Sequence, residues 1–127
     1  MPTMQTCKTV LVVEDNELER EGLAALLQGE GYNVLTAANG TEALGRLRAD
    51  PPPDLVLLDM MMSDQDGWQL LRLVRNNPVL SSTRVVIVTG LGIACPEWAN
   101  SLGACGLIHK PIDTDELHHE LKRLAHE

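Results

Sequence analysis

The segment Leu55-Val56-Leu57-Leu58-Asp59 decides the fold of this chain. Four consecutive apolar residues are typical of a β-strand buried on both faces, because a strand with one wet face alternates apolar and polar residues. The run then closes abruptly on the carboxylate of Asp59. An apolar run that ends at a polar side chain is therefore the pattern to compare with the rest of the chain.

Similar apolar runs lie on both sides of this segment and predict four further strands. They are Val10-Leu11-Val12-Val13, Val34-Leu35-Thr36-Ala37, Val85-Val86-Ile87-Val88 and Gly106-Leu107-Ile108. Helical spacing predicts helices over about 16–28 (stopped by Gly29 and Gly31), 41–49, 68–75, 96–102 and 113–124. Buried strands that alternate with helices indicate an α/β fold, a doubly wound five-stranded parallel sheet with helices on both faces. Since the sequence shows no internal repeat, we expect one domain over residues 1–127.

The charge of the chain is strongly acidic, with 18 Asp and Glu against 10 Lys and Arg and a formal net charge of −8. Nucleic-acid binding requires a basic surface, so we expect no direct nucleic-acid partner. No apolar stretch is long enough to span a membrane, and the N-terminus lacks the apolar stretch of a secretory signal. We therefore expect a cytoplasmic protein without a membrane partner, whose surface attracts cations and binds other proteins.

Three cysteines, Cys7, Cys95 and Cys105, show no C-x-x-C spacing. An odd number leaves at least one of them outside any disulfide within the chain. We interpret them as small buried side chains rather than as redox or metal-binding groups.

Polar side chains follow the predicted strands at the point where each strand ends. Glu14 and Asp15 follow the first strand, Asp59 closes the third, Thr89 ends the fourth, and Lys110 follows the fifth. The carboxyl ends of parallel strands lie along one edge of the sheet, where ligands bind in open α/β folds. Taken singly, Asp59 also suits a turn and Asp15 a helix cap. Taken together, the five side chains predict one shared pocket.

The residue types in this pocket restrict its chemistry. Two carboxylates a few ångströms apart repel each other by about 4 kcal/mol at an effective dielectric constant of about 20, so a positive group must offset them or one must stay protonated. Ligands that are all oxygen fit Mg²⁺, whereas zinc prefers the His and Cys that this pattern lacks. A carboxylate nucleophile beside a metal, a lysine and a hydroxyl contains the groups needed to form and hold an acyl phosphate.

Several segments together carry a family resemblance. They are Val10-Leu11-Val12-Val13-Glu14-Asp15-Asn16, Leu55-Val56-Leu57-Leu58-Asp59-Met60-Met61-Met62, Asp64-Gln65-Asp66-Gly67-Trp68, Val85-Val86-Ile87-Val88-Thr89 and Lys110-Pro111. The chain resembles the CheY-like receiver domains of two-component response regulators over essentially its whole length. This resemblance implies a flavodoxin-like sheet with strand order 2-1-3-4-5.

The resemblance also implies a role for each site residue. Asp59 would accept a phosphoryl group from a phosphohistidine on a sensor histidine kinase or a histidine phosphotransfer protein. The Mg²⁺ ligands would be Glu14, Asp15, Asp59 and the main-chain carbonyl of Met61. Phosphoryl oxygens would bind the side chains of Lys110 and Thr89 and the main-chain N–H of Met60. Such a domain phosphorylates and dephosphorylates itself rather than turning over as an enzyme, and it acts through a downstream protein target or a fused output domain.

Departures from the family pattern concern the output rather than the chemistry. Ser63 stands where the family usually has proline, and Leu107 where many members have Tyr or Phe. The glycine-flanked segment 90–103 predicts a short or loosely formed fourth helix. Our hypothesis is that signalling runs through reordering of the loop at Gly90 to Pro96 and not through rotation of an aromatic side chain.

Three alternatives use related scaffolds. An aspartyl-nucleophile phosphatase would carry a second carboxylate two residues after the nucleophile, where this chain has Met61. A flavin-binding protein would need a phosphate-binding loop after the first strand, where Glu14 and Asp15 stand. A pseudo-receiver that binds partners without phosphorylation is disfavoured by the intact set of polar site residues.

Overall fold

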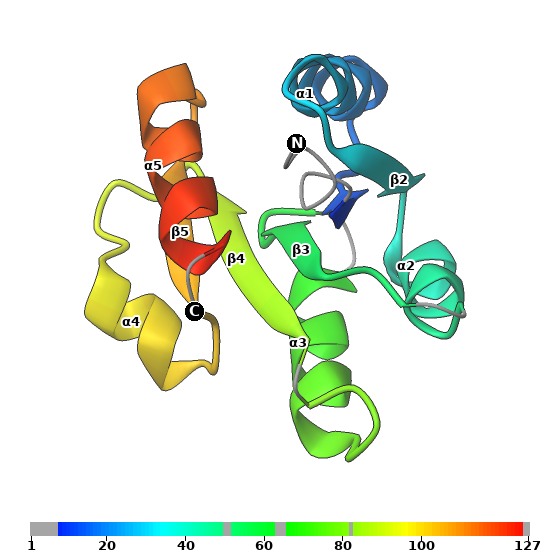
Figure 1. Cartoon of the computed structure of the whole chain (residues 1–127). Coiled ribbons are helices and arrows are strands. Elements are labelled where there is room, and N and C mark those ends of the chain that lie inside the picture. The colour runs from blue at the N-terminus through cyan, green and yellow to red at the C-terminus, as the bar shows by residue number, and fades with distance from the viewer. Residues whose placement is uncertain (1–7, 50–51, 63–65, 82, 126–127) are drawn as a thin grey trace.

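The computed structural model describes residues 8–49, 52–62, 66–81 and 83–125, which form one parallel sheet wrapped by helices (Figure 1). The strands are β1 (Thr9–Val13), β2 (Asn33–Ala37), β3 (Leu55–Asp59), β4 (Arg84–Thr89) and β5 (Gly106–His109). The helices are α1 (Glu17–Gly29), α2 (Gly40–Leu47), α3 (Asp66–Asn76), α4 (Pro96–Ser101) and α5 (Thr114–Ala125). The strand order is β2-β1-β3-β4-β5, and every pairing is parallel. The expected doubly wound α/β fold and its strand order are confirmed.

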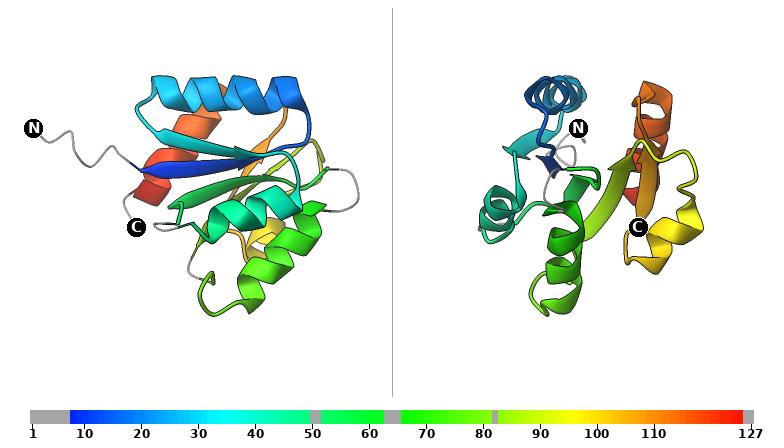
Figure 2. Two further views of the ribbon diagram at one scale, coloured as in Figure 1. Left: turned by 90° about the vertical axis from the view of Figure 1, so that its right-hand side faces the viewer. Right: turned by 180° about the vertical axis from the view of Figure 1, so that it is seen from behind.

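The helices divide between the two faces of the sheet (Figure 2). One face packs against α1 and α5, whose buried contacts include Leu27 and Leu117. The other packs against α2, α3 and α4, with Leu47 and Leu71 among its buried residues. Successive strand residues point to opposite faces, so a strand that is covered on both faces needs apolar residues at nearly every position. This two-sided burial explains the unbroken apolar runs in the sequence.

The register of the strands brings their carboxyl ends to one edge of the sheet. Leu58 pairs with Val13 of β1 and with Ile87 of β4. The next residue, Asp59, pairs with Val88. Thr89 pairs with His109 of β5, the residue before Lys110. The predicted site residues therefore leave the sheet at the same level.

The first helix ends slightly later than predicted. It continues through Gly29 and stops before Gly31, whose φ of 98° lies in the left-handed region that glycine adopts without strain. At its start, the Asn16 side chain accepts a hydrogen bond of 2.9 Å from the N–H of Glu19. This cap fixes the first turn of α1 beside the end of β1.

The fourth helix is short, as the glycine and proline pattern predicted, and spans only Pro96–Ser101.

The interpretation of the cysteines as buried is wrong for Cys95 and Cys105, which are both exposed and unpaired. Both lie in the connections that flank α4, where the neighbouring Ala94 and Ala104 take the buried positions. Cys7 lies outside the described residues.

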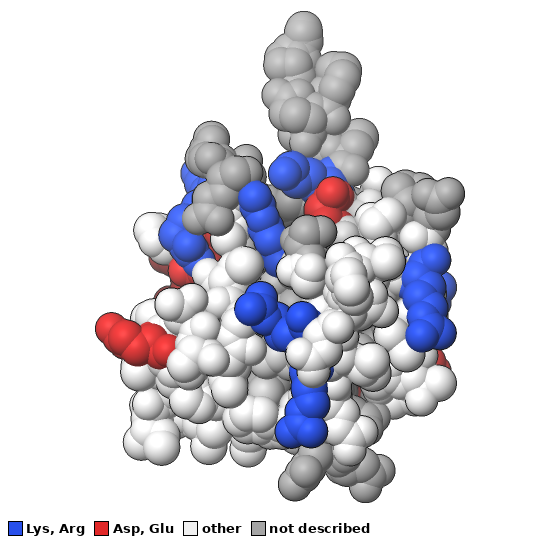
Figure 3. All heavy atoms as spheres, turned by 90° about the horizontal axis from the view of Figure 1, so that it is seen from below, with Lys and Arg blue, Asp and Glu red and all other residues white. Residues whose placement is uncertain are grey.

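Charge is distributed unevenly along the helices. Acidic residues occupy the first turns of α1, α2, α4 and α5, and basic residues occupy the last turns of α2, α3 and α5, which complements the helix dipoles. The first-turn acids include Glu17, Glu19, Glu42, Asp115 and Glu116, and the last-turn bases include Arg46, Arg75, Lys122 and Arg123. Figure 3 views the molecule from the side of α2, α3 and α4, and on this face Lys and Arg outnumber Asp and Glu despite the acidic composition.

Gly67, in the first turn of α3, packs directly against the backbone that carries Asp59. A Cβ atom at Gly67 would lie 2.7 Å from the carbonyl oxygen of Asp59 and 3.0 Å from the Cα of Met60. We predict that Gly67→Ala lowers the free energy of unfolding by about 1–3 kcal/mol, because neither backbone atom moves easily. Urea denaturation measures this loss.

Gly45 provides the control, because it lies within α2 and a Cβ there would meet nothing within 4 Å. Gly45→Ala should be neutral or stabilising by up to about 1 kcal/mol, the difference in helix propensity. A Gly67→Ala protein as stable as the wild type would contradict the close packing.

Candidate functional site

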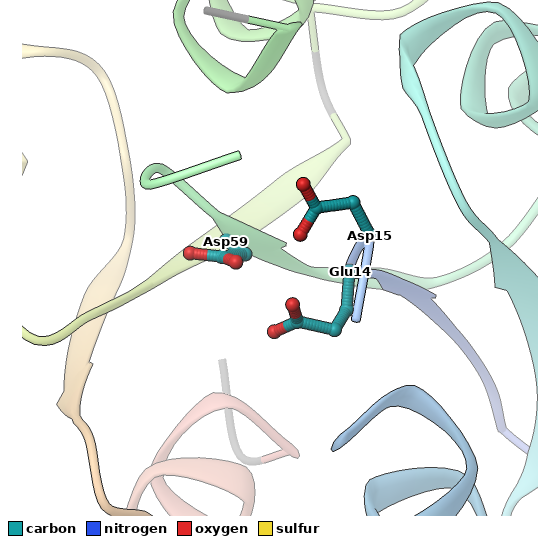
Figure 4. A group of neighbouring side chains, drawn as sticks. All are labelled: Glu14, Asp15 and Asp59. Atoms are coloured by element: carbon teal, nitrogen blue, oxygen red, sulfur yellow. The ribbon is translucent and has the colours of Figure 1, made fainter. Parts of the chain in front are cut away.

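Three carboxylates converge at the carboxyl edge of the sheet (Figure 4). Glu14 and Asp15 follow β1 and lie on the same side as Asp59, which ends β3. One carboxylate oxygen from each residue lies within 4.8 Å of the other two. Glu14 and Asp59 are buried, whereas Asp15 is exposed to solvent. The structure thus brings together the three acids that the sequence placed in one pocket.

The ammonium group of Lys110 lies among these acids. Its Nζ is 2.8 Å from Oε1 of Glu14 and 3.2 Å from Oδ2 of Asp59. A third carboxylate, from Glu19 in the first turn of α1, lies closest at 2.7 Å. An ammonium group has three hydrogens, so these three carboxylates satisfy it completely. Glu19 was not predicted, and the only signal for it is a charge in the first turn of the helix that follows the acidic pair.

The carboxylate of Asp59 is held on both oxygens. Oδ2 faces Lys110, and Oδ1 accepts a hydrogen bond of 2.9 Å from the N–H of Met61. The N–H of Met60, which we expected to bind a phosphoryl oxygen, donates to the carbonyl of Val88 at 3.2 Å, and its role toward a phosphoryl group stays a prediction. Met60 extends the ladder between β3 and β4, so the first main-chain N–H that can turn toward the acid belongs to Met61.

Thr89 lies at the end of β4 and is completely buried. Its hydroxyl accepts a hydrogen bond of 3.1 Å from the N–H of Leu91, and its carbonyl accepts one of 2.8 Å from the N–H of Lys110. Among the described residues, no hydrogen bond joins this hydroxyl to the three acids. A hydroxyl that accepts one bond still has its own hydrogen to donate. Thr89 therefore lies at the correct edge of the sheet, and its role in binding phosphoryl oxygens stays a prediction.

The protonation of Glu14 reflects its surroundings. The pKa of this carboxyl is raised from 4.5 to about 7, because burial and then the negative charge of Asp59 outweigh the hydrogen bonds from Lys110 and the Asn16 N–H, which lower it. For Lys110, burial alone would lower the pKa, but the carboxylates of Glu14, Glu19 and Asp59 outweigh burial and raise it. The site therefore carries more negative charge than one ammonium neutralises.

A divalent cation fits this arrangement. The group consists of Glu14, Asp15 and Asp59, three carboxylates with no His or Cys, and hard cations such as Mg²⁺ prefer oxygen ligands. Burial and the nearby Asp59 disfavour the ionised form of Glu14, so three carboxylates this close together need more positive charge than Lys110 supplies. The main-chain carbonyl of Met61 remains a predicted fourth ligand.

Comparison with known proteins assigns the family. Residues 10–122 match the model of the response regulator receiver domain. The chain belongs to this family. Receiver domains are signalling domains that generally use Mg²⁺ at an acidic pocket, and the acids assembled here are typical of their phosphorylation site.

Relatives of this receiver domain include both short and long proteins. It is 35% identical over 115 residues to sporulation initiation phosphotransferase F of Bacillus subtilis, with 90% of each chain covered. It is 31% identical to protein PilG of Pseudomonas aeruginosa, covering 85% of this chain and 80% of PilG. Chemotaxis response regulator CheY4 of Vibrio cholerae superposes with a TM-score of 0.79 at 30% identity, covering 92% of this chain and 98% of CheY4.

Other relatives are much longer than the matched region. The chain spans 24% of an NtrX-like relative from Rickettsia bellii and 54% of transcriptional regulatory protein CrdR of Helicobacter pylori. The same receiver fold is thus used alone and as one part of a larger protein. Within the described residues, every helix is too short or too polar to traverse a lipid bilayer.

The raised pKa of Glu14 predicts how the stability of the metal-free receiver depends on pH. A carboxyl whose pKa rises on folding contributes stability below its unfolded value of 4.5, and this contribution is lost as pH rises through about 7. The free energy of unfolding in EDTA should therefore fall across this range, by up to about 3 kcal/mol from Glu14. Urea denaturation at intervals of pH measures the slope.

The matched variant is Glu14→Gln, which keeps the shape of the side chain but cannot ionise. Its stability should change less with pH than that of the wild type between pH 4.5 and 7. Parallel curves for the two proteins would show that Glu14 ionises normally in the folded state.

Proposed function

We propose that Asp59 of this receiver domain accepts a phosphoryl group from a phosphohistidine in a Mg²⁺-dependent reaction. The observation that supports this most directly is the setting of its buried carboxylate, with the Lys110 ammonium at 3.2 Å and the Met61 N–H at 2.9 Å on its two oxygens. Two further carboxylates lie within 4.8 Å, so a cation and the acceptor share one pocket.

The proposed transfer exchanges one bond to phosphorus for another. An oxygen of Asp59 bonds to phosphorus as the phosphorus–nitrogen bond of the phosphohistidine breaks, and the imidazole leaves with the electron pair of that bond and takes up a proton. Lys110 balances the negative charge of the phosphoryl oxygens, and Thr89 donates its hydroxyl hydrogen to one of them. Phosphoryl transfer depends mainly on positioning and charge neutralisation, which these groups supply without a separate acid or base. Attack by water on the phosphorus then breaks its bond to the Asp59 oxygen, which releases inorganic phosphate and restores the free carboxylate of Asp59.

Mg²⁺ would be held by Glu14, Asp15, Asp59 and the main-chain carbonyl of Met61. When bound, it supplies positive charge that offsets the repulsion between the carboxylates and the incoming phosphoryl group. Its binding favours the ionised form of Glu14, the group whose burial raises its pKa.

The partners follow from the proposed chemistry. The donor is a sensor histidine kinase or a histidine phosphotransfer protein, and the output is a downstream protein target or a fused output domain. The net charge of −8 supports a protein partner over a nucleic acid. We further propose that residues 1–127 act as one receiver domain, located in the cytoplasm.

Intact mass spectrometry with a small phosphodonor tests the acceptor. With phosphoramidate and Mg²⁺, the wild type should gain one phosphoryl group, and EDTA should abolish the gain. Asp59→Asn should show no gain, because an amide cannot form the acyl phosphate.

Asp54→Asn is the matched control for this experiment. Asp54 lies at the opposite edge of the sheet, where its Oδ2 accepts a hydrogen bond of 2.8 Å from the N–H of Thr9. This variant should be labelled as fast as the wild type. Labelling that persists in Asp59→Asn would move the acceptor elsewhere, and no labelling of the wild type would favour a pseudo-receiver that binds partners without phosphorylation.

The loop after β4 is the proposed route of the signal. The hydroxyl of Thr89 accepts a hydrogen bond from the N–H of Leu91. If this hydroxyl turns toward a phosphoryl group, the N–H of Leu91 loses its acceptor. At the far end of the loop, Nε2 of His109 lies 3.0 Å from the carbonyl of Ala94. Leu107 is buried in the core, as its apolar side chain requires.

Backbone NMR tests this route. With Mg²⁺ and a beryllofluoride mimic of the phosphoryl group, we expect chemical-shift changes at Leu91 and across residues 90–103, because the Leu91 N–H loses its partner. Asp59→Asn with the same additions should show none of these changes. Shifts confined to the acidic pocket and the segment after β3 would rule the loop out.

A further inference from the structure

The Lys110 ammonium has a partner that does not belong to the acidic group proposed to bind metal. Glu19 lies nearest to Nζ, at 2.7 Å, compared with 3.2 Å for Asp59. Its side chain is about half exposed and comes from the first turn of α1. The carboxylates close enough to share one ion are Glu14, Asp15 and Asp59, without Glu19.

Glu19 is held in place by the junction between β1 and α1. Oε2 of Glu14 accepts a hydrogen bond of 3.1 Å from the N–H of Asn16. The Asn16 side chain in turn accepts a hydrogen bond of 2.9 Å from the N–H of Glu19. Arg20 reaches back to the carbonyl of Glu14 at 3.0 Å. The first turn of α1 is therefore tied to the acidic pocket, and Glu19 faces Lys110 from a fixed direction.

Competition for the ammonium follows from its hydrogen count. Its three hydrogens are already directed at Glu14, Asp59 and Glu19, so a phosphoryl oxygen must displace one of them. A cation bound by Glu14 and Asp59 would neutralise much of their charge. Glu19 would keep its full charge and become the strongest competitor for Lys110.

We propose that Glu19 is a positioning residue that draws Lys110 toward α1 and thereby limits how fast Asp59 is phosphorylated. This inference rests on the proposed phosphorylation of Asp59. The ion pair holds the ammonium on the α1 side of the pocket in the resting state, and its release is part of the reaction.

The test compares Glu19→Gln with Glu17→Gln. Both residues are exposed acids in the first turn of α1, so both variants remove one charge from the same helical turn, but of the two only Glu19 contacts Lys110. Initial rates of phosphorylation by phosphoramidate are measured at saturating Mg²⁺. Glu19→Gln should be roughly two- to fivefold faster than Glu17→Gln, the size of one partly exposed ion pair.

Two further measurements separate the contact from a general effect of charge or folding. Glu19→Asp keeps the charge but is one methylene shorter, so it should react nearly as fast as Glu19→Gln. The NMR signals of the Lys110 side chain should shift in both Glu19 variants and stay unchanged in Glu17→Gln. In a Lys110→Ala background, Glu19→Gln should no longer change the rate.

Each outcome decides a different proposal. No labelling of the wild type would overturn the phosphorylation of Asp59 and this inference with it. Normal labelling with equal rates in Glu19→Gln and Glu17→Gln, or a slower Glu19→Gln, would overturn the role of Glu19 alone. If Glu19→Gln still speeds phosphorylation in the Lys110→Ala background, the effect comes from the charge of Glu19 and not from its contact with Lys110. This result would overturn the proposal.

Discussion

The structure depends on one cation, the ammonium of Lys110, placed among carboxylates at the edge of the sheet. It joins Glu14 and Asp59 although 96 and 51 residues separate them from the lysine along the chain. Two buried acids so close together repel each other, and this repulsion would push apart the ends of β1 and β3. Lys110, which follows β5, therefore connects the end of β5 to the ends of β1 and β3, neither of which is a neighbour of β5 in the sheet. The same contacts of Lys110 therefore hold the strand ends together and assemble the site.

The site keeps a charge imbalance that a purely structural cluster would not retain. The ammonium of Lys110 contacts the carboxylates of Glu14, Glu19 and Asp59, and Asp15 adds a fourth carboxylate to the site. Burial raises the pKa of Glu14 to about 7. Replacement of such groups by apolar residues often stabilises a protein. Residues that break the general rule of burial in this way mark a place where stability has been given up for function.

The sequence predicted the fold and most of the pocket because both follow from simple periodicity. Apolar runs define parallel strands, and parallel strands bring their carboxyl ends together, which places Glu14, Asp59 and Lys110 in one pocket without knowledge of any side-chain conformation. Contacts that depend on the path of a loop or the rotation of a side chain were missed. Glu19 reaches Lys110 only because the Asn16 cap orients α1, and the N–H at Asp59 belongs to Met61 because Met60 continues the ladder. Cys95 and Cys105 illustrate the same limit, since sequence spacing does not show which way a short connection turns.

The opposite charges at the two ends of the helices have a consequence for encounters in solution. Parallel strands place all helix N-termini at the edge that holds the site, so the first-turn acids give that edge a negative potential, while last-turn bases such as Arg75 and Lys122 lie at the other end. The domain therefore behaves as a permanent electric dipole. Its field attracts cations to the pocket and would orient a partner that carries a basic surface before contact. At physiological ionic strength this steering reaches about 8 Å, so added salt should slow productive encounters more than it weakens the buried contacts of the site.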